Sequence, residues 1–306
     1  MTMRLSNQMV AHATLTDLQG VANQLRDTQR KMSSGKEITR PSDDPFGTTK
    51  ALTTRRDVED ITQLQSNVDD ALSWQSVTET ALSGINDVAQ RARELLVQGG
   101  SDSNGPTERE AIAKEIDQLI ETAKGEANAS VGGRFVFAGT ATTTQPYNPG
   151  GSDAYAGDSG NVVRTIGPGV SLPVNVRGSD FLGGDPAVAQ PDGKLLTTLR
   201  DIATHLRGGT PADANALRNG DLVALDRNLD TLSSTRATIG AQTNRLDSAK
   251  SRLLELEGNS RSQLSDVEDA DMAKVLTDFS LQQSVYQSAL KAGANIVQAS
   301  LLDFIH

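Results

Sequence analysis

The sequence contains no cysteine, and histidine and aromatic residues are scarce. Its 306 residues include three His, one Trp and three Tyr, and aromatic residues make up 3% of the chain. The absence of cysteine excludes disulfides, thiolate catalysis and Cys-ligated metals. His12, His205 and His306 lie too far apart in the sequence to show metal-ligand spacing. An enzyme core of this size would normally bury more aromatic surface. Composition therefore favours a protein without cofactor, metal or catalytic activity.

Long apolar runs are missing as well. None approaches the roughly 20 residues that span a bilayer, so membrane insertion is not expected. The first 15 residues lack the apolar core of a cleaved signal peptide, so an extracellular destination would need a route that leaves the N-terminus uncleaved. The formal net charge of −10 and the pI near 4.8 argue against a nucleic-acid partner, which requires a basic face.

The chain is rich in apolar residues at heptad spacing. In residues 5–32 they recur every three or four positions, and Gly35 is a suitable stop signal. Asp44 is a good N-cap and Pro45 a good first residue for a second helix, which should extend to Gly99. At about 55 residues, this helix has the length of a coiled coil.

The second half repeats this pattern in reverse. A capping box at Thr107–Glu110 should open a third helix, and helices resume at Lys194. A further helix should begin at Thr210–Asp213 and carry a heptad to Gly258. A second capping box, Ser265–Glu268, should open the last helix after a break over 258–265.

Between the helical halves, residues 131–193 hold 13 of the 27 Gly and six of the ten Pro. Short strands are predicted at 135–137 and 162–166. Residues 170–176 alternate apolar and polar as a half-buried strand does, after a Gly-Pro-Gly turn. This segment should form a small β insertion.

Folding the chain at this insertion pairs helices of similar length. The sequence predicts a mainly α protein: an antiparallel hairpin of long helices with a β domain at its tip. The expected domains are a terminal coiled coil (1–34 with 266–306), an inner helical bundle (35–130 with 194–265) and an outer β-rich domain (131–193).

The stretch "SSGKEITRPSDDPFG", residues 33–47, also suggests chemistry. Ser33 and Lys36 match the Ser-x-x-Lys pattern of some acyl-transfer enzymes, but the partner motifs of those enzymes are absent. Asp43-Asp44 lacks the other carboxylates of a calcium loop. We therefore interpret this stretch as a connector between domains, formed by Gly35, Lys36, Arg40, Asp43, Asp44 and Pro45. A catalytic domain using Ser33 and Lys36 remains the alternative from another class.

Two stretches resemble a known family. "MSSGKEITRPSDDPFG" is similar to the N-terminal signature of the flagellin superfamily of bacterial flagella, and "SDVEDADMAKVLTDFSLQQSVYQSALKAGANIVQASLLDFI" is similar to its C-terminal region. "GGRFVFAGTATTTQPY" and the ending "AGANIVQASLLDFI" look more like the branch that joins hook to filament than like the filament subunits, the flagellins. Flagellin remains the alternative.

The resemblance implies a structural, flagellin-like adaptor secreted through the flagellar type III apparatus. It implies a ring of about eleven copies, between a neighbouring hook-associated ring protein and flagellin. It also implies a cytoplasmic export chaperone on the C-terminal helix. A two-helix coiled coil exposes much apolar surface, so we expect neighbouring copies to cover it. The residues expected to pair the terminal helices and support assembly are Leu15, Leu18, Leu25 and Met32 with Leu276, Phe279, Tyr286, Leu290, Val297, Leu301 and Phe304.

Overall fold

A computed structural model of the chain describes residues 2–101 and 104–305, with the side chains of 2–8, 11 and 295–305 left undescribed. The predicted pairing residues Val297, Leu301 and Phe304 therefore lie outside the described side chains. Long helices dominate, as predicted, and the chain divides into two compact units. One contains the two ends of the chain up to Asp60 and from Leu256, and the other contains Ile61–Glu255.

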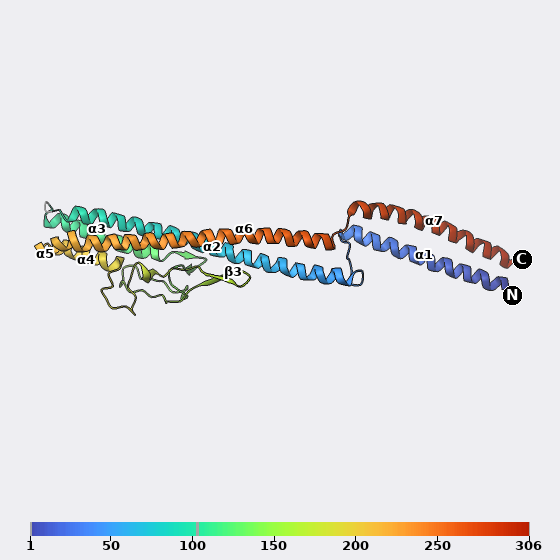
Figure 1. Ribbon diagram of the computed structural model, residues 1–306, viewed down its shortest axis with the longest axis horizontal. Helices are drawn as coiled ribbons and strands as arrows, with labels where there is room; N and C mark the ends of the chain where they lie inside the picture. Colours follow the sequence, from blue (N-terminus) through green and yellow to red (C-terminus); the bar gives the residue numbers. More distant parts are fainter. Residues whose placement is uncertain (1, 102–103, 306) are drawn as a thin grey trace. The chain divides into compact units, whose positions relative to one another are not determined.

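The terminal unit contains four helical segments. They are α1 (Thr2–Ser34), the start of α2 (Pro45–Gly99), the end of α6 (Leu222–Glu268) and α7 (Met272–Ile305). Helices α1 and α7 lie side by side and antiparallel, so the start of α1 lies beside the end of α7 (Figure 1). Helix α2 has the 55 residues that the sequence predicts. Helix α6 has 47 residues but begins and ends later than the helix predicted from Thr210–Asp213 to Gly258, and the terminal helices have 33 and 34 residues.

The second unit is a helical bundle that carries the insertion. The remainders of α2 and α6 are joined there by α3 (Pro106–Ala127), α4 (Leu195–Gly208) and α5 (Pro211–Asn215). A π-helical turn, Ala216–Asp221, leads from α5 into α6. Apolar residues at helical spacing form the core, among them Leu82, Ile85, Leu96, Ile116, Ile120, Leu199, Leu225, Leu232 and Leu246.

Of the helix starts predicted from capping residues, the one at Thr210 is confirmed and the one at Thr107 is wrong. The cap at Thr210 is confirmed: its side chain accepts from the amide of Asp213, whose carboxylate accepts in return. The box at Thr107 is wrong, because α3 begins at Pro106, whose missing N–H and fixed φ suit the first helical position. This proline sets the helix start before the threonine can act as its cap.

The break predicted over 258–265 is wrong. Helix α6 continues without interruption to Glu268, so Ser265 lies inside it and opens no helix. A glycine in a helix interior destabilises the helix by only about 1 kcal/mol relative to alanine. The helix on both sides of Gly258 is long enough to tolerate that cost. The break lies at 269–271. There Asp271 Oδ1 accepts from the amides of Ala273 (3.0 Å) and Lys274 (3.2 Å) and caps α7.

The insertion has little regular structure. Strands β1 (Ser130–Val131) and β2 (Arg134–Phe135) form one hairpin, and β3 (Val163–Gly167) and β4 (Val170–Pro173) form the other, both antiparallel. The predicted turn at 167–169 is confirmed, and its Gly169 adopts a φ of +69°. A single 3₁₀ turn, Gly178–Asp180, follows. The strand predicted over 135–137 ends at Phe135, and the next two residues are buried outside any strand.

A small aromatic core orders these loops. Phe137 and Phe181 contact edge to face with ring centroids 5.4 Å apart, and Tyr147 lies 5.7 Å from Tyr155. Tyr147 donates to the carbonyl of Gly183 (2.7 Å), and Tyr155 donates to that of Phe137 (2.8 Å). Burial raises the pKa of both phenols. The few aromatic residues of the chain are thus concentrated where secondary structure is sparse.

The insertion lies along the side of the bundle helices. Gln75 of α2 donates to the carbonyl of Val174 (3.1 Å), and Asn67 donates to that of Thr165 (3.2 Å). The insertion has this place because α3 precedes it in the chain. From the end of α2, α3 returns antiparallel to α2 for 22 residues, about 33 Å at 1.5 Å per residue. The insertion therefore begins well before the tip of the bundle.

Candidate assembly site

The connector residues 35–44 and the break between α6 and α7 meet in the terminal unit. The amide of Glu37 donates to the carbonyl of Glu268 (2.8 Å), and that of Ala270 donates to the carbonyl of Gly35 (2.9 Å). Lys36 and Asp269 thereby form an isolated antiparallel bridge. Two segments more than 230 residues apart are joined as a minimal β ladder, which we call the connector bridge.

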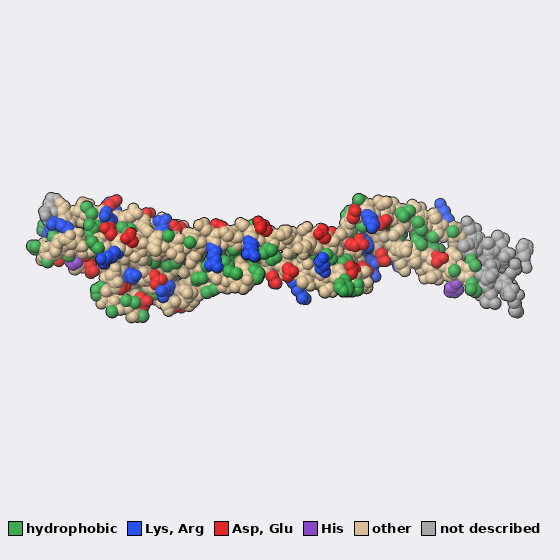
Figure 2. All heavy atoms as spheres, in the orientation of Figure 1, with side chains coloured by type: hydrophobic (Ala, Val, Ile, Leu, Met, Phe, Trp, Pro, Cys, Tyr) green, Lys and Arg blue, Asp and Glu red, His purple; other side chains and the backbone are tan. Residues whose placement is uncertain are grey.

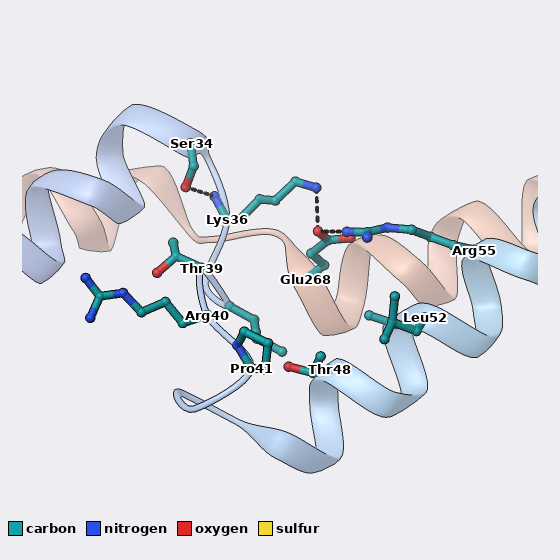
Figure 3. A pocket seen from close by; sticks show the side chains of 11 residues that line it. Ser34, Lys36, Thr39, Arg40, Pro41, Thr48, Leu52, Arg55 and Glu268 are labelled. Carbon is teal, nitrogen blue, oxygen red and sulfur yellow. Dashed lines mark hydrogen bonds and ion pairs between the residues drawn. The ribbon is translucent and has the colours of Figure 1, made fainter.

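A buried carboxylate lies beside this bridge. The side chain of Glu268 is 6% exposed, and its Oε1 accepts from both Lys36 Nζ and Arg55 (Figure 3). Lys36 comes from the connector, Arg55 from α2 and Glu268 from the end of α6. One carboxylate thus ties three segments together, and charge-assisted hydrogen bonds of this kind are the stronger ones in proteins.

The two aspartates of the signature have separate structural roles. Asp43 Oδ2 accepts from the amide of Arg40 (2.8 Å) and from the hydroxyl of Thr39 (2.9 Å), which closes the connector turn. Asp44 Oδ1 accepts from the amide of Gly47 (2.9 Å), and the predicted N-cap of α2 is therefore confirmed. The guanidinium of Arg40 points away from Glu268 (Figure 3).

Two glycines permit this geometry. Gly35 ends α1 with a φ of +70°, a conformation that glycine adopts without steric cost. A Cβ on Gly47 would come within 2.4 Å of the Asp44 carboxylate and 2.5 Å of Ile38 Cδ1. The helix cap and the connector therefore pack against each other only because position 47 carries no side chain.

A pocket of about 400 Å³ opens between the connector and α2. Its wall consists of Ile38, Pro41, Ala51 and Leu52, and its charged edge is formed by Lys36, Arg40, Arg55 and Glu268 (Figure 3). Leu52 is 49% exposed, so apolar surface inside the pocket faces solvent. Such a concave, half-apolar surface can receive a side chain from another molecule.

Replacing Glu268 with alanine should loosen the connector bridge. Lys36 and Arg55 would lose their shared carboxylate, and a hydrogen bond to a charged group contributes about 1.5–3 kcal/mol. Both cations are about two-fifths exposed, so we expect the lower end of that range. Amide exchange at Glu37 and Ala270 should accelerate roughly tenfold. Glu255→Ala, an exposed position on the same helix, should leave these amides unchanged; equal protection in both variants would contradict the role of Glu268.

The contacts of Lys36 bear on the catalytic alternative. Its ammonium is bonded to Glu268, and its backbone amide donates to Ser34 Oγ at 3.2 Å. The hydrogen bonds recorded across the described residues include none between Ser33 and Lys36.

Within the same residues, no group of three or more His, Asp or Glu side chains is placed to hold a metal ion. None of the described helices has the length and hydropathy needed to cross a bilayer.

Two contacts set the register of the terminal helices. Thr28 of α1, which is 8% exposed, donates to Gln282 Oε1 of α7 at 2.6 Å. Leu18 lies directly against Gly293. Because the helices are antiparallel, this register places Leu25 opposite Tyr286 and Met32 opposite Phe279.

Other residues predicted to pair the helices lie beside this seam. Leu15 is 57% exposed, Leu276 52% and Leu290 44%. On the α7 wheel, Leu276 and Leu290 lie on one flank of the seam, together with Met272, at 40% exposure. Leu281 and Val285, also exposed, lie on the opposite flank. Figure 2 shows apolar side chains at the surface of α1 and α7. The pair thus leaves apolar flanks that a single chain does not cover.

Sequence reasoning missed the buried ion pairs of Glu268. We expected this carboxylate at a helix start, where it would complement the helix dipole; it lies instead at a helix end, between two cations. The sequence offered one signal, the basic residues Lys36 and Arg55. They meet Glu268 only in the folded chain, so their pairing cannot be recognised from the sequence alone.

Comparison with known proteins places these features in context. The profile of the bacterial flagellin N-terminal helical region matches residues 5–142, and that of the C-terminal helical region matches residues 222–305. The chain is 26% identical over 316 residues to flagellar hook-associated protein 3 of Escherichia coli (strain K12), covering 98% of each chain. It is 26% identical over 313 residues to flagellin of Bacillus subtilis (strain 168), covering 99% of this chain and 100% of that one.

Solved structures agree on the fold. A putative flagellar hook-associated protein from Vibrio parahaemolyticus superposes with a TM-score of 0.65 at 24% identity, over 74% of this chain and 100% of that one. Bacillus cereus FlgL superposes with a TM-score of 0.58 at 23% identity, over 70% of this chain and 99% of that one. At these identities the likeness concerns the fold alone.

Proposed function

Because this chain belongs to the bacterial flagellin family, we propose that it is an adaptor subunit that joins the flagellar hook to the filament. The observation that carries the proposal is the terminal helix pair, whose apolar flanks are exposed in a single chain. Its similarity to hook-associated protein 3 over nearly its whole length supports a structural role in the flagellum.

The proposed working form is a ring of about eleven copies, the number that the resemblance implies; a head-to-tail contact forms such a ring where its repeated rotation closes. In this proposal, residues 1–34 and 266–306 form the terminal coiled-coil domain that lines the ring. Residues 35–130 and 194–265 form the surrounding bundle, and 131–193 face outward. The protein acts without catalysis.

The proposed partners follow from this position. A neighbouring hook-associated ring protein lies on one side of the ring and flagellin on the other. A cytoplasmic chaperone covers the apolar flanks of α7 before export, and the protein works outside the cell at the hook–filament junction. Leu276 and Leu290, exposed on one flank of α7, are the residues such partners would cover.

The second candidate function is that of a filament subunit, since the sequence identity to flagellin, 26%, equals that to hook-associated protein 3. The stretch from Gly132 to Tyr147 and the chain ending support the adaptor, because both look more like the junction branch of the family.

Deleting the gene separates the two candidates. For an adaptor, we expect cells that complete the hook, carry no filament and release flagellin into the medium, and a plasmid copy should restore attachment. Loss of the filament without flagellin in the medium would instead identify this chain as the filament subunit. Cells that keep their filaments would contradict both.

A further inference from the structure

A phenylalanine stands in solvent on the first turn of α2. Phe46 is 91% exposed, the highest value among the exposed large apolar side chains described. Figure 2 shows apolar atoms at the surface where α2 begins. Burying a phenylalanine side chain stabilises a protein by about 1.5–3 kcal/mol relative to leaving it in water. The single chain leaves this contribution unused.

The same unit contains the half-apolar pocket between the connector and α2. Thr48, Ala51, Leu52 and Arg55 of α2 line it. At 3.6 residues per turn, these positions lie roughly 120–180° around the helix from position 46. Phe46 therefore projects from the face opposite to the pocket, and the phenylalanine of a chain cannot fill that chain's own pocket.

A knob and a hole on opposite faces of one unit form a head-to-tail pair. Repeated from copy to copy, such a heterologous contact generates a ring or a helix. A two-fold dimer would instead require knob and hole to lie on the same face. The arrangement on α2 thus matches a closed or helical assembly of identical chains.

Charge is consistent with this contact. At the pocket, Lys36, Arg40 and Arg55 outnumber Glu268. Asp44, exposed, immediately precedes the knob and caps its helix. A carboxylate beside the knob would thus approach a net positive pocket edge, which favours this pairing.

We propose that Phe46 of one copy inserts into the connector pocket of the next copy, against Leu52, and that this contact links neighbouring subunits. The proposal deepens the proposed function, on which it rests, by naming the side chain and the pocket that join adjacent chains at the level of the connector.

The absence of cysteine makes crosslinking a direct test. Full-length Phe46→Cys and Leu52→Cys variants are expressed together in the deletion strain, and flagella are isolated under mild oxidation. We expect a disulfide-linked dimer that contains both variants, with either variant alone giving at least tenfold less. Thr53→Cys, exposed on the same face as Phe46 and about 10 Å further along the helix, is the matched control and should not crosslink to Leu52→Cys.

The outcomes separate this contact from the proposed function. Variants that restore filament attachment but give no 46–52 disulfide overturn the contact and leave the adaptor intact. A 46–52 disulfide found along the filament overturns the adaptor and keeps the contact. Phe46→Asp leaves the fold unchanged because the side chain is exposed, and it should abolish filament attachment. If it does so while no 46–52 disulfide forms, Phe46 docks on a different protein and the proposal is wrong.

Discussion

Replacing Lys124 with methionine should release the loop at residues 148–154 from the helical bundle. Lys124 is completely buried in α3, and its ammonium contacts Asp153 Oδ1 (2.6 Å), Glu121 Oε1 (3.2 Å) and the carbonyl of Gly151 (3.0 Å). Methionine has a similar length but no donor. The loop would therefore lose the cation that holds it to α3.

The loss of stability in Lys124→Met depends on the contacts that Asp153 keeps. Burial favours the neutral form of Asp153, yet hydrogen bonds from Arg200 and Lys124 outweigh burial and lower its pKa. Removing one partner of a buried ion pair costs about 3–5 kcal/mol. Because Arg200 of α4 still contacts Asp153 at 2.9 Å, we expect the lower end, about 3 kcal/mol.

Hydrogen exchange can measure this change in the full chain. Amides at 150–155 should exchange roughly a hundredfold faster in Lys124→Met, while those of α6 should keep their protection. Lys114→Met removes a lysine of the same helix whose side chain is 71% exposed, and should have no such effect. Unchanged exchange in both variants would contradict the role of Lys124 in holding this loop to α3.

Leu290→Asp should abolish filament attachment without unfolding the chain. Leu290 is 44% exposed and lies beside the α1–α7 seam, so a charge there is tolerated in the single chain. In an assembly this flank would be covered by a neighbour, and burying an unpaired carboxylate there costs several kcal/mol. Filament-bearing cells should fall to the level of the deletion strain, while the helical content of the purified chain stays normal.

The control places the same charge elsewhere on α7. Ser284 is exposed on the face of the helix opposite to the seam, and Ser284→Asp should retain attachment. A Leu290→Asp strain that still builds filaments would exclude this flank from assembly.

Much of this fold could be predicted because its determinants are local. Heptad spacing gave the long helices, and Asp44-Pro45 and Thr210-Pro211 marked two helix starts, because capping depends on residues within one turn. Gly258 and Ser265 gave a misleading break because a local signal of about 1 kcal/mol is outweighed by the cooperative propagation of the helix that continues on either side.

The site could be predicted only in part. The connector was identified from residues 35–45, but its bridge to Glu268 depends on a pairing between distant segments that no local pattern specifies. The exposure of Phe46 could not be predicted from the sequence either. An apolar residue that follows Asp-Pro at a helix start would be expected to face the core. Burial depends on which helix face meets a neighbour, and that is decided by tertiary contacts.

The connector bridge also has a kinetic consequence. Thr28 and Gln282 are 254 positions apart, and Glu37 and Glu268 are 231 apart, so these contacts close almost the longest loops the chain can form. Closing a loop costs entropy that grows with its length, and contacts distant in sequence slow folding. The bundle, whose helices α3 and α4 pack through shorter loops, should condense first and bring the two ends together. Until the last residues of the chain are available, α1 therefore has no α7 to pair with, and the assembly surface of the terminal unit is not formed.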